Sequence, residues 1–502
     1  MAHTESFWRI DARLSSFPQL SGEQRVDVAV VGGGIAGLTA ALLLQRRGKR
    51  VALIEARRLG AGETGNTTAH LTEVLDRRYH ALESKFGQRG AQLAAESSRC
   101  AIDTIERLAS EAGLEYSEFT RNSGYLFAES PEQVHELERE YEAFQRVGTL
   151  AEWADDTGLP FQTQRAIRIS RQAQFHPLKY LSRLCDAFVA EGGQVFEQTT
   201  LLDIHDGAPC LLHTDQGDLK ADDALILTNV PVSNRVAIHT KVAAYRSYAL
   251  AGPMANTALD ANLYWDLDDP YHYIRTATSG DRSFVIVGGA DHKTGQEPQT
   301  EDPFDTLERY ARARLPGFEK TAQWSGQIIE PADGLPFIGK NTDAQHIYVA
   351  TGFAGNGMTF GTLSALILAD TVLGRPNEWA ELYDATRIKP LAQGRQYIAE
   401  NIDFPTHIIR DRFSKGDVEH YEDVPRGDGC LVRRNGKMQA VYRDPSGGFH
   451  VRSAVCPHLG CYVRWNTEEK TWDCPCHGSR FNKDGAMLNG PATRDLDAVM
   501  PD

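Results

Sequence analysis

Short apolar runs and helical periodicity alternate near the start of the chain. Residues 26–31 (VDVAVV) form a nearly continuous apolar run, which predicts a buried parallel strand. Residues 38–48 (LTAALLLQRRG) carry apolar side chains at helical spacing and end at a glycine. Residues 49–56 (KRVALIEA) then predict a second buried strand. The order strand, helix, strand is a βαβ unit, which predicts an α/β fold built on a parallel sheet.

A glycine pattern occupies the turn between the first strand and the helix. Gly32, Gly34 and Gly37 stand in the G-x-G-x-x-G positions, and the acid Glu55 closes the second strand. In this pattern the first glycine permits a tight turn, the second lets the backbone approach a pyrophosphate, and the third lets the helix pack on the strand. The free N–H groups of the helix attract phosphates, and the acid accepts hydrogen bonds from ribose hydroxyls. The pattern therefore predicts a dinucleotide site for either FAD or NAD.

Three further segments bear on the choice of dinucleotide. Residues 56–72 (ARRLGAGETGNTTAHLT) form a loop rich in Gly and Thr, and residues 331–340 read PADGLPFIGK. Residues 347–374 (IYVATGFAGNGMTFGTLSALILADTVLG) predict a strand, a glycine-rich turn and a long apolar helix. In this order, the segments resemble the amino-acid oxidase family of FAD enzymes, which includes glycine oxidase, sarcosine oxidase and D-amino-acid dehydrogenase. The resemblance covers about residues 25–390.

The resemblance implies FAD as the cofactor and a Rossmann-like FAD-binding domain with an inserted mixed-sheet substrate domain. We expect FAD-binding parts at about residues 25–76, 166–239 and 326–390, and the substrate domain at about 77–165 and 240–325. The cofactor-binding residues that it implies are Gly32, Gly34, Ile35, Ala36, Gly37, Glu55, Ala56, Arg57, Gly62, Thr67, Thr68, Gly352, Gly355, Asn356, Gly357, Met358 and Thr359.

The sequence indicates the substrate-binding residues less clearly than the cofactor-binding residues. The family's hydride-transfer chemistry needs a positioned substrate and a cation for a substrate carboxylate more than it needs acid–base side chains. Arg275 is one candidate anchor, with Tyr273 on the same predicted strand, and Arg246 is another, because arginine can bind a carboxylate in a bidentate manner. His70 could form a covalent flavin link, although a histidine in a polar loop is more often structural.

Two boxes near the C-terminus carry a different chemistry. They read CPHLGC (456–461) and CPCHGS (474–479). Cys456 and His458 in the first box, with Cys474 and His477 in the second, offer two thiolates and two imidazoles. This set suits a [2Fe–2S] cluster with cysteines on one iron and histidines on the other. A structural zinc also accepts these four ligands, but it gives no reason for the spare cysteine in each box.

The paired boxes resemble the Rieske iron–sulfur family. The resemblance implies a disulfide between Cys461 and Cys476 and a hydrogen bond from Ser479 to a cluster sulfur. Phe481 stands where many respiratory members carry a tyrosine, so we expect a reduction potential below the respiratory maximum. We expect an all-β Rieske domain over residues 416–502, after a linker at 391–415.

Composition narrows the set of partners. The chain has 502 residues and a formal net charge of −15, so nucleic acid and anionic membrane surfaces are poor partners. No apolar run is long enough for a membrane span, and we see no secretory signal. Cys100, Cys185 and Cys210 are scattered, as is typical of reduced thiols, and we expect a cytoplasmic protein.

Taken together, the two resemblances imply an FAD-dependent dehydrogenase that oxidises a C–N bond of an amine or amino acid. Electrons would pass one at a time to the fused cluster and on to a one-electron acceptor: a cytochrome, a ferredoxin or a quinone-linked protein. Two alternatives stay open: an oxidase that reduces O₂ beside a peripheral Rieske domain, and a redox-sensing or electron-carrier protein. The sequence also leaves open whether the Rieske domain docks on its own chain or on a neighbour's.

Overall fold

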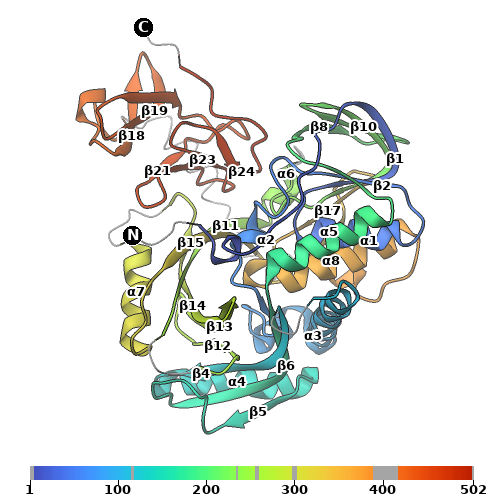
Figure 1. Cartoon of the computed structure of the whole chain (residues 1–502), viewed down its shortest axis with the longest axis vertical. Coiled ribbons are helices and arrows are strands. Elements are labelled where there is room, and N and C mark those ends of the chain that lie inside the picture. Colours follow the sequence, from blue (N-terminus) through green and yellow to red (C-terminus); the bar gives the residue numbers. More distant parts are fainter. Residues whose placement is uncertain are drawn as a thin grey trace.

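The computed structural model describes residues 5–114, 118–232, 236–254, 259–296, 302–387 and 416–499. These residues form a parallel sheet with helices, a second large sheet, and a small C-terminal β domain (Figure 1). The expected linker at 391–415 lies outside the described residues.

The first sheet is the predicted dinucleotide-binding sheet. Its strands run in the order β16–β17–β10–β1–β2–β7, and β1 pairs in parallel with β2 and with β10. An antiparallel pair, β8 and β9, extends it from β10. The strands are β1 (Gly22–Val31), β2 (Val51–Ile54), β7 (Gln194–Phe196), β8 (Leu201–His205), β9 (Cys210–Thr214), β10 (Gly217–Ile226), β16 (Phe337–Lys340) and β17 (Ile347–Thr351).

Three helices cover this sheet: α1 (Ile35–Gln45), α5 (Pro177–Ala190) and α8 (Gly357–Val372). Helix α1 packs between α5 and α8 and is buried along nearly its whole length, as its apolar composition requires. The third glycine of the pattern makes this packing possible. A Cβ at Gly37 would lie 1.9 Å from the carbonyl oxygen of Gly32, so only glycine lets the helix approach the turn so closely.

The second sheet runs in the order β15–β11–β14–β13–β12–β4–β6–β3, with β5 paired to β6. Its strands are β3 (His70–Leu71), β4 (Phe119–Ala128), β5 (Ala151–Ala154), β6 (Arg165–Phe175), β11 (Val242–Gly252), β12 (Leu263–Trp265), β13 (Tyr273–Ser279), β14 (Arg282–Lys293) and β15 (Ala322–Pro331). The accompanying helices are α3 (Tyr79–Glu111), α4 (Pro131–Val147) and α7 (Pro303–Arg314). The fold class is therefore the predicted one, with a mixed sheet inserted between parts of the parallel sheet.

The domain divisions differ in detail from those expected. Strand β6 pairs with β4 in the second sheet, so the chain returns to the first sheet only with α5, after residue 175 rather than at 166. Strand β15 likewise belongs to the second sheet up to Pro331, because it pairs with β11 along its whole length. The pairing of these long strands therefore shifts the divisions that the family resemblance implied.

The C-terminal domain is all-β across residues 416–499, apart from the 3-10 helix η3 (Tyr421–Asp423), as predicted. One sheet contains β18 (Asp428–Arg434), β19 (Lys437–Arg443) and β20 (Phe449–Ser453). The other contains β21 (Arg464–Asn466), β22 (Thr471–Asp473), β23 (Arg480–Asn482) and β24 (Met487–Asn489). Trp472 and Phe481 are fully buried at its centre. The two cysteine–histidine boxes form loops next to this second small sheet.

Short elements complete the described chain: η1 (Phe7–Arg9), α2 (Glu63–Asn66), α6 (Val236–His239), η2 (Ala354–Asn356) and α9 (Ala380–Tyr383). Among the described residues, no helix combines the length and apolar character that crossing a bilayer requires.

Candidate functional site: a dinucleotide cavity beside a cluster-binding domain

A long cavity begins at the glycine turn after β1 and reaches the second sheet. It is formed at the carboxyl ends of the parallel strands, where α/β folds bind their ligands. Most of the sequence-predicted cofactor residues line it: Gly32, Gly34, Ile35, Ala36, Glu55, Ala56, Arg57, Gly62, Thr67, Thr68, Gly355, Asn356, Gly357 and Met358. The cavity lining does not include Gly37, Gly352 or Thr359. Gly37 packs against the backbone of the glycine turn. Thr359 donates a 3.3 Å hydrogen bond to the carbonyl of Thr72.

The residues around the glycine turn fit a dinucleotide. A Cβ at Gly34 would lie 3.0 Å from the hydroxyl of Thr64, so a side chain here would intrude where the backbone must approach a ligand. The carboxylate of Glu55 accepts hydrogen bonds from the backbone N–H groups of Gly33 (2.7 Å) and Arg57 (2.9 Å). Burial raises the pKa of Glu55, and these two bonds oppose the rise. The bonds hold the carboxylate at the strand end, where it would bind ribose.

Several lining residues carry no motif in the sequence. Thr199, Thr228, Asn229 and Gln327 come from loops and strands far apart along the chain. Thr228 and Asn229 follow β10 at its carboxyl end, and this position in a parallel strand was the signal that could have identified them. The C-terminal domain adds Met487, Leu488, Asn489, Gly490, Ala492 and Thr493, which no sequence pattern indicated.

Aromatic rings and carboxylates line the end of the cavity that the second sheet forms. Tyr271, Tyr273 and Trp265 belong to this wall, together with Asp76 and Asp291. The Tyr271 hydroxyl donates to Oδ1 of Asp76 at 2.9 Å, and the hydroxyls of Tyr273 and Ser247 lie 2.9 Å apart. Burial raises the pKa of both tyrosines, so both remain protonated donors. Tyr273 thus lines the cavity, and its predicted role toward the substrate stays a prediction.

The two predicted arginines lie elsewhere. Arg275 is buried behind the wall, where its guanidinium donates to the backbone carbonyls of Thr68 (3.0 Å) and Ala69 (2.6 Å). Arg246 points to the C-terminal domain and pairs with Glu469. Neither lines the cavity, and each would have to give up these bonds to reach a substrate there. Their placement therefore does not support the expected role as carboxylate anchors.

His70 is part of the aromatic wall. Its ring centroid lies 5.4 Å from that of Tyr273 and 5.5 Å from that of Trp265, and its Nδ1 lies 3.2 Å from the Thr68 hydroxyl. Burial and then the charge of Arg275 lower its pKa well below the ordinary value. The imidazole is therefore neutral at physiological pH. The covalent flavin link considered for His70 stays a prediction.

The cysteine–histidine boxes come together as the sequence predicted. Cys456 and Cys474 are buried side by side; a hydrogen bond between them lowers the pKa of Cys456 and raises that of Cys474. The rings of His458 and His477 have centroids 5.0 Å apart, and burial lowers the pKa of each to about 3. Two thiols and two neutral imidazoles on facing loops fit a [2Fe–2S] cluster of mixed ligation.

Neighbours of these ligands were also singled out in the sequence, and the predicted bond from Ser479 to a cluster sulfur stays a prediction. Cys461 and Cys476 form a disulfide that ties the two loops together, which confirms the predicted pairing. Ser479 hydrogen-bonds to the thiol of Cys456 and accepts a 3.0 Å bond from the backbone N–H of Ala492. Such contacts orient the ligands and tune a cluster.

The C-terminal domain packs against the rest of its own chain (Figure 1). The ring of His239, at the end of α6, lies 4.7 Å from that of His458 and 5.4 Å from that of His477. Gly478 makes the close approach possible. It has a φ of +78°, and a Cβ there would lie 2.4 Å from the side chain of Ala244. The side of the cluster site formed by His458 and His477 therefore faces α6.

A buried ion network holds this interface. Arg246 on β11 binds Glu469 through Nε (3.1 Å) and Nη2 (2.8 Å), and Arg480 reaches the same carboxylate at 3.0 Å. Burial alone would raise the pKa of Glu469, but the charges of the two arginines outweigh it and lower that pKa to about 2. One carboxylate thus links two cations from different domains.

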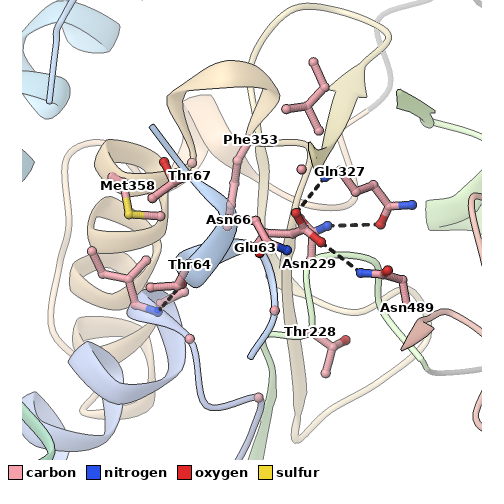
Figure 2. Close-up of a pocket in the computed structure, with 18 of the residues that line it drawn as sticks. Glu63, Thr64, Asn66, Thr67, Thr228, Asn229, Gln327, Phe353, Met358 and Asn489 are labelled. Atoms are coloured by element: carbon pink, nitrogen blue, oxygen red, sulfur yellow. Dashed lines mark hydrogen bonds between the residues drawn. The ribbon is translucent and has the colours of Figure 1, made fainter. Parts of the chain in front are cut away.

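A hydrogen-bond network connects the interface to the cavity. Figure 2 shows Glu63 between Gln327 and Asn489. The Glu63 carboxylate accepts from the backbone N–H of Gln327 at 2.6 Å and from the amide of Asn489 at 2.8 Å. Asn489 belongs to β24, so the C-terminal domain closes one side of the dinucleotide cavity.

Both parts of the chain match known families. Residues 27–371 match the FAD dependent oxidoreductase family, and residues 414–500 match the Rieske [2Fe-2S] domain. The fold and the site thus define a flavin oxidoreductase fused to an iron–sulfur module. The chain belongs to the FAD dependent oxidoreductase family and carries a C-terminal Rieske domain.

Relatives and solved structures agree with this assignment. A Rieske 2Fe-2S iron–sulfur protein of Bacillus subtilis (strain 168), YhfW, is 33% identical over 99% of this chain and 97% of its own length. Gamma-glutamylputrescine oxidoreductase of Escherichia coli (strain K12) is 24% identical over 76% of this chain and 91% of its own. The crystal structure of glycine oxidase from Geobacillus kaustophilus has a TM-score of 0.61 at 21% identity, and the match covers 72% of this chain and 99% of that one.

Proposed function

We propose that this chain is an FAD-dependent dehydrogenase that oxidises a C–N bond of an amine or amino acid and sends the electrons through its own Rieske domain to an external one-electron acceptor. The observation that carries the proposal is the docking of the C-terminal domain. This domain lines part of the dinucleotide cavity and places the rings of His458 and His477 against α6 of the oxidoreductase part.

When bound, FAD accepts a hydride, and a Rieske cluster accepts single electrons at a comparatively high potential. The chain's own residues would hold both groups. The glycine turn and Glu55 would bind the dinucleotide, while Cys456 and Cys474 would bind one iron, and His458 and His477 the other. The interface between the two sites is held by buried, fully paired charges. A fixed arrangement of this kind favours transfer within one chain over transfer between chains.

The names of the relatives support the proposed substrate class. One relative is named for gamma-glutamylputrescine, and one structural neighbour is named a glycine oxidase, so both an amine and an amino acid are represented. The acceptor would be a cytochrome, a ferredoxin or a quinone-linked protein. The free cysteines of the oxidoreductase part, Cys100, Cys185 and Cys210, support a cytoplasmic location, where thiols stay reduced.

The test uses the full chain and a His458→Ala variant. In the absence of oxygen, a panel of amines and amino acids is screened for bleaching of the flavin absorbance, and reduction of a cytochrome is followed afterwards. The variant should keep substrate-dependent bleaching and lose cytochrome reduction. Equal cytochrome reduction by both proteins, together with stoichiometric peroxide in air, would instead favour the oxidase. A flavin that no compound bleaches would favour the redox sensor or carrier.

A further inference from the structure

The charge of the cavity is the opposite of what a carboxylate substrate requires. Its wall includes the carboxylates of Glu55, Glu63, Asp76 and Asp291. Among the described residues that line it, Arg57 is the sole arginine and no lysine is present. Arg57 lies in the loop after β2, two residues beyond Glu55, and thus at the dinucleotide end of the cavity. The described residues that line the end formed by the second sheet thus include acids and neither arginine nor lysine, and Arg275 lies behind them with its guanidinium bound to backbone carbonyls.

In three of these carboxylates both oxygens accept a hydrogen bond. Glu55 and Glu63 accept the bonds described above. Asp76 accepts from the Tyr271 hydroxyl at 2.9 Å and from the backbone N–H of Gly355 at 2.6 Å, so it ties the aromatic wall to the glycine-rich turn. Each of its oxygens therefore already accepts one hydrogen bond from the protein.

Asp291 is different. It lines the cavity from β14, and its Oδ1 is shielded from solvent without a hydrogen-bond partner among the described residues. Burial raises its pKa to about 7; a hydrogen bond from Ser247 opposes this, the charge of Asp76 adds to it, and His272 opposes it. A buried carboxylate oxygen without a partner is costly, and a cationic ligand group would remove that cost.

The rings beside Asp291 suit the same ligand. The centroids of Tyr271 and Tyr273 lie 5.8 Å apart, and that of His70 lies 5.4 Å from Tyr273 and 5.5 Å from Trp265. These four rings form a continuous aromatic wall. The faces of tyrosine and tryptophan rings attract ammonium groups, most strongly where water is excluded.

We propose that this cavity selects a cationic amine without a carboxylate on the reacting carbon, and that Asp291 is the counter-ion of the substrate's ammonium group. The inference rests on the proposed function and narrows it from amines or amino acids to amines. Arg246 and Arg275, the residues that could have bound a carboxylate, are committed to Glu469 and to backbone carbonyls.

The experiment compares matched pairs on the holoenzyme: putrescine with ornithine, and phenethylamine with phenylalanine. Each pair differs by one α-carboxylate. The amine of a pair should bleach the flavin anaerobically with the lower KM. Asp291→Asn should raise that KM at least about tenfold, since it removes the charge of the ion pair. Asp281→Asn, in the exposed turn of the same hairpin, is the control and should leave KM unchanged.

Three outcomes separate this inference from the proposed function. Preference for the carboxylated member of each pair, or an unchanged amine KM in Asp291→Asn, overturns the inference and leaves the dehydrogenase standing. If no compound bleaches the flavin, the dehydrogenase fails, and binding is then measured by titrating the oxidised flavin spectrum with tetramethylammonium. A spectral shift that Asp291→Asn abolishes supports the cation site, and no shift in the wild-type protein overturns it.

Discussion

The side-chain amide of Gln327 donates a 2.7 Å hydrogen bond to the carbonyl oxygen of Gly478. Gln327 lines the dinucleotide cavity, and Gly478 directly follows the predicted cluster ligand His477. A single side chain therefore contacts both cofactor sites. Its other amide atom, the oxygen, accepts from Asn229 at 3.3 Å, which fixes the orientation of the amide in the interface.

Gln327→Ala should slow electron transfer from the flavin to the cluster. The change removes a hydrogen bond worth about 1 kcal/mol and opens space beside Gly478, so the two domains should fit less tightly. FAD and iron contents should stay at wild-type levels. Stopped-flow spectroscopy under anaerobic conditions measures the two reduction phases separately. Gln323→Ala is the matched control, because Gln323 lies on the same strand and does not line the cavity. An unaltered rate of cluster reduction in Gln327→Ala would show that the hydrogen bond from Gln327 to Gly478 is not needed for electron transfer.

Glu469→Gln should weaken docking of the Rieske domain. Arg246 and Arg480 would both stay buried without their shared counter-ion, a change that costs about 3 kcal/mol in comparable buried pairs. Limited proteolysis should cut between the domains faster, and cytochrome reduction should fall while flavin reduction by substrate persists. Glu468→Gln tests the adjacent carboxylate, for which no arginine pairing is seen among the described contacts. Equal rates of proteolysis in the two variants would show that the buried ion network is not the main interaction that holds the Rieske domain in place.

His477→Ala should abolish the Rieske-type EPR signal and lower the iron content. The imidazole would be an iron ligand, and alanine offers no donor in its place. FAD should remain bound, because the glycine turn and Glu55 lie on the other side of the interface. His450→Ala, which removes a histidine paired with Asp484 in the same domain, should retain iron and the signal. Zinc in place of iron in freshly purified protein would contradict the cluster assignment.

Gly34→Ala and Gly34→Val should lower FAD occupancy in a graded manner. The added Cβ would lie 3.0 Å from the Thr64 hydroxyl, and the larger valine would intrude further into the path of the pyrophosphate. Occupancy is read from the ratio of flavin to protein absorbance, with iron content as the control for intact folding of the C-terminal domain. Full occupancy in Gly34→Val would mean that the phosphates do not pass this turn.

The affinity for a permanently charged amine should rise with pH. Burial raises the pKa of Asp291 to about 7, so the carboxyl is protonated below that pH and becomes an anion above it. The facing groups are Ser247 on β11, Asp76 before α3, Tyr271 and His272 just before β13, and Tyr273 at its first position. Tetramethylammonium keeps its charge throughout, so its binding should strengthen as pH rises through about 7. Asp291→Asn should remove this pH dependence. A wild-type affinity that does not change with pH would contradict a raised pKa for Asp291.

Local patterns in the sequence were enough to predict both cofactor-binding motifs. The βαβ unit was predicted because its glycines act on their immediate neighbours: Gly37 touches Gly32 within one turn. The cluster boxes were recognised because each loop brings its own cysteine and histidine within three residues. The disulfide between Cys461 and Cys476 came from the family resemblance and is confirmed.

The residues at the end of the cavity where the substrate would bind could not be predicted from local sequence patterns. Arg275 stands in a strand beside Tyr273, yet alternation along a strand does not say which backbone carbonyls will meet its guanidinium. Those carbonyls belong to Thr68 and Ala69, some two hundred positions earlier in the chain. No sequence motif marked Asp291 as a binding residue, because its proposed role depends on aromatic rings that come from other segments of the chain.

By itself, then, the sequence determined the two cofactor classes, the order of the domains and the parallel sheet, since each depends on residues close together along the chain. The tertiary structure was needed to show where Arg246 and Arg275 point, that Oδ1 of Asp291 lacks a hydrogen-bond partner among the described residues, and that the Rieske domain docks on its own chain. These features arise from pairs such as Arg246 with Glu469 and Glu63 with Asn489. The partners lie hundreds of residues apart, and folding alone brings them together in an environment where burial sets their charge and their bonding.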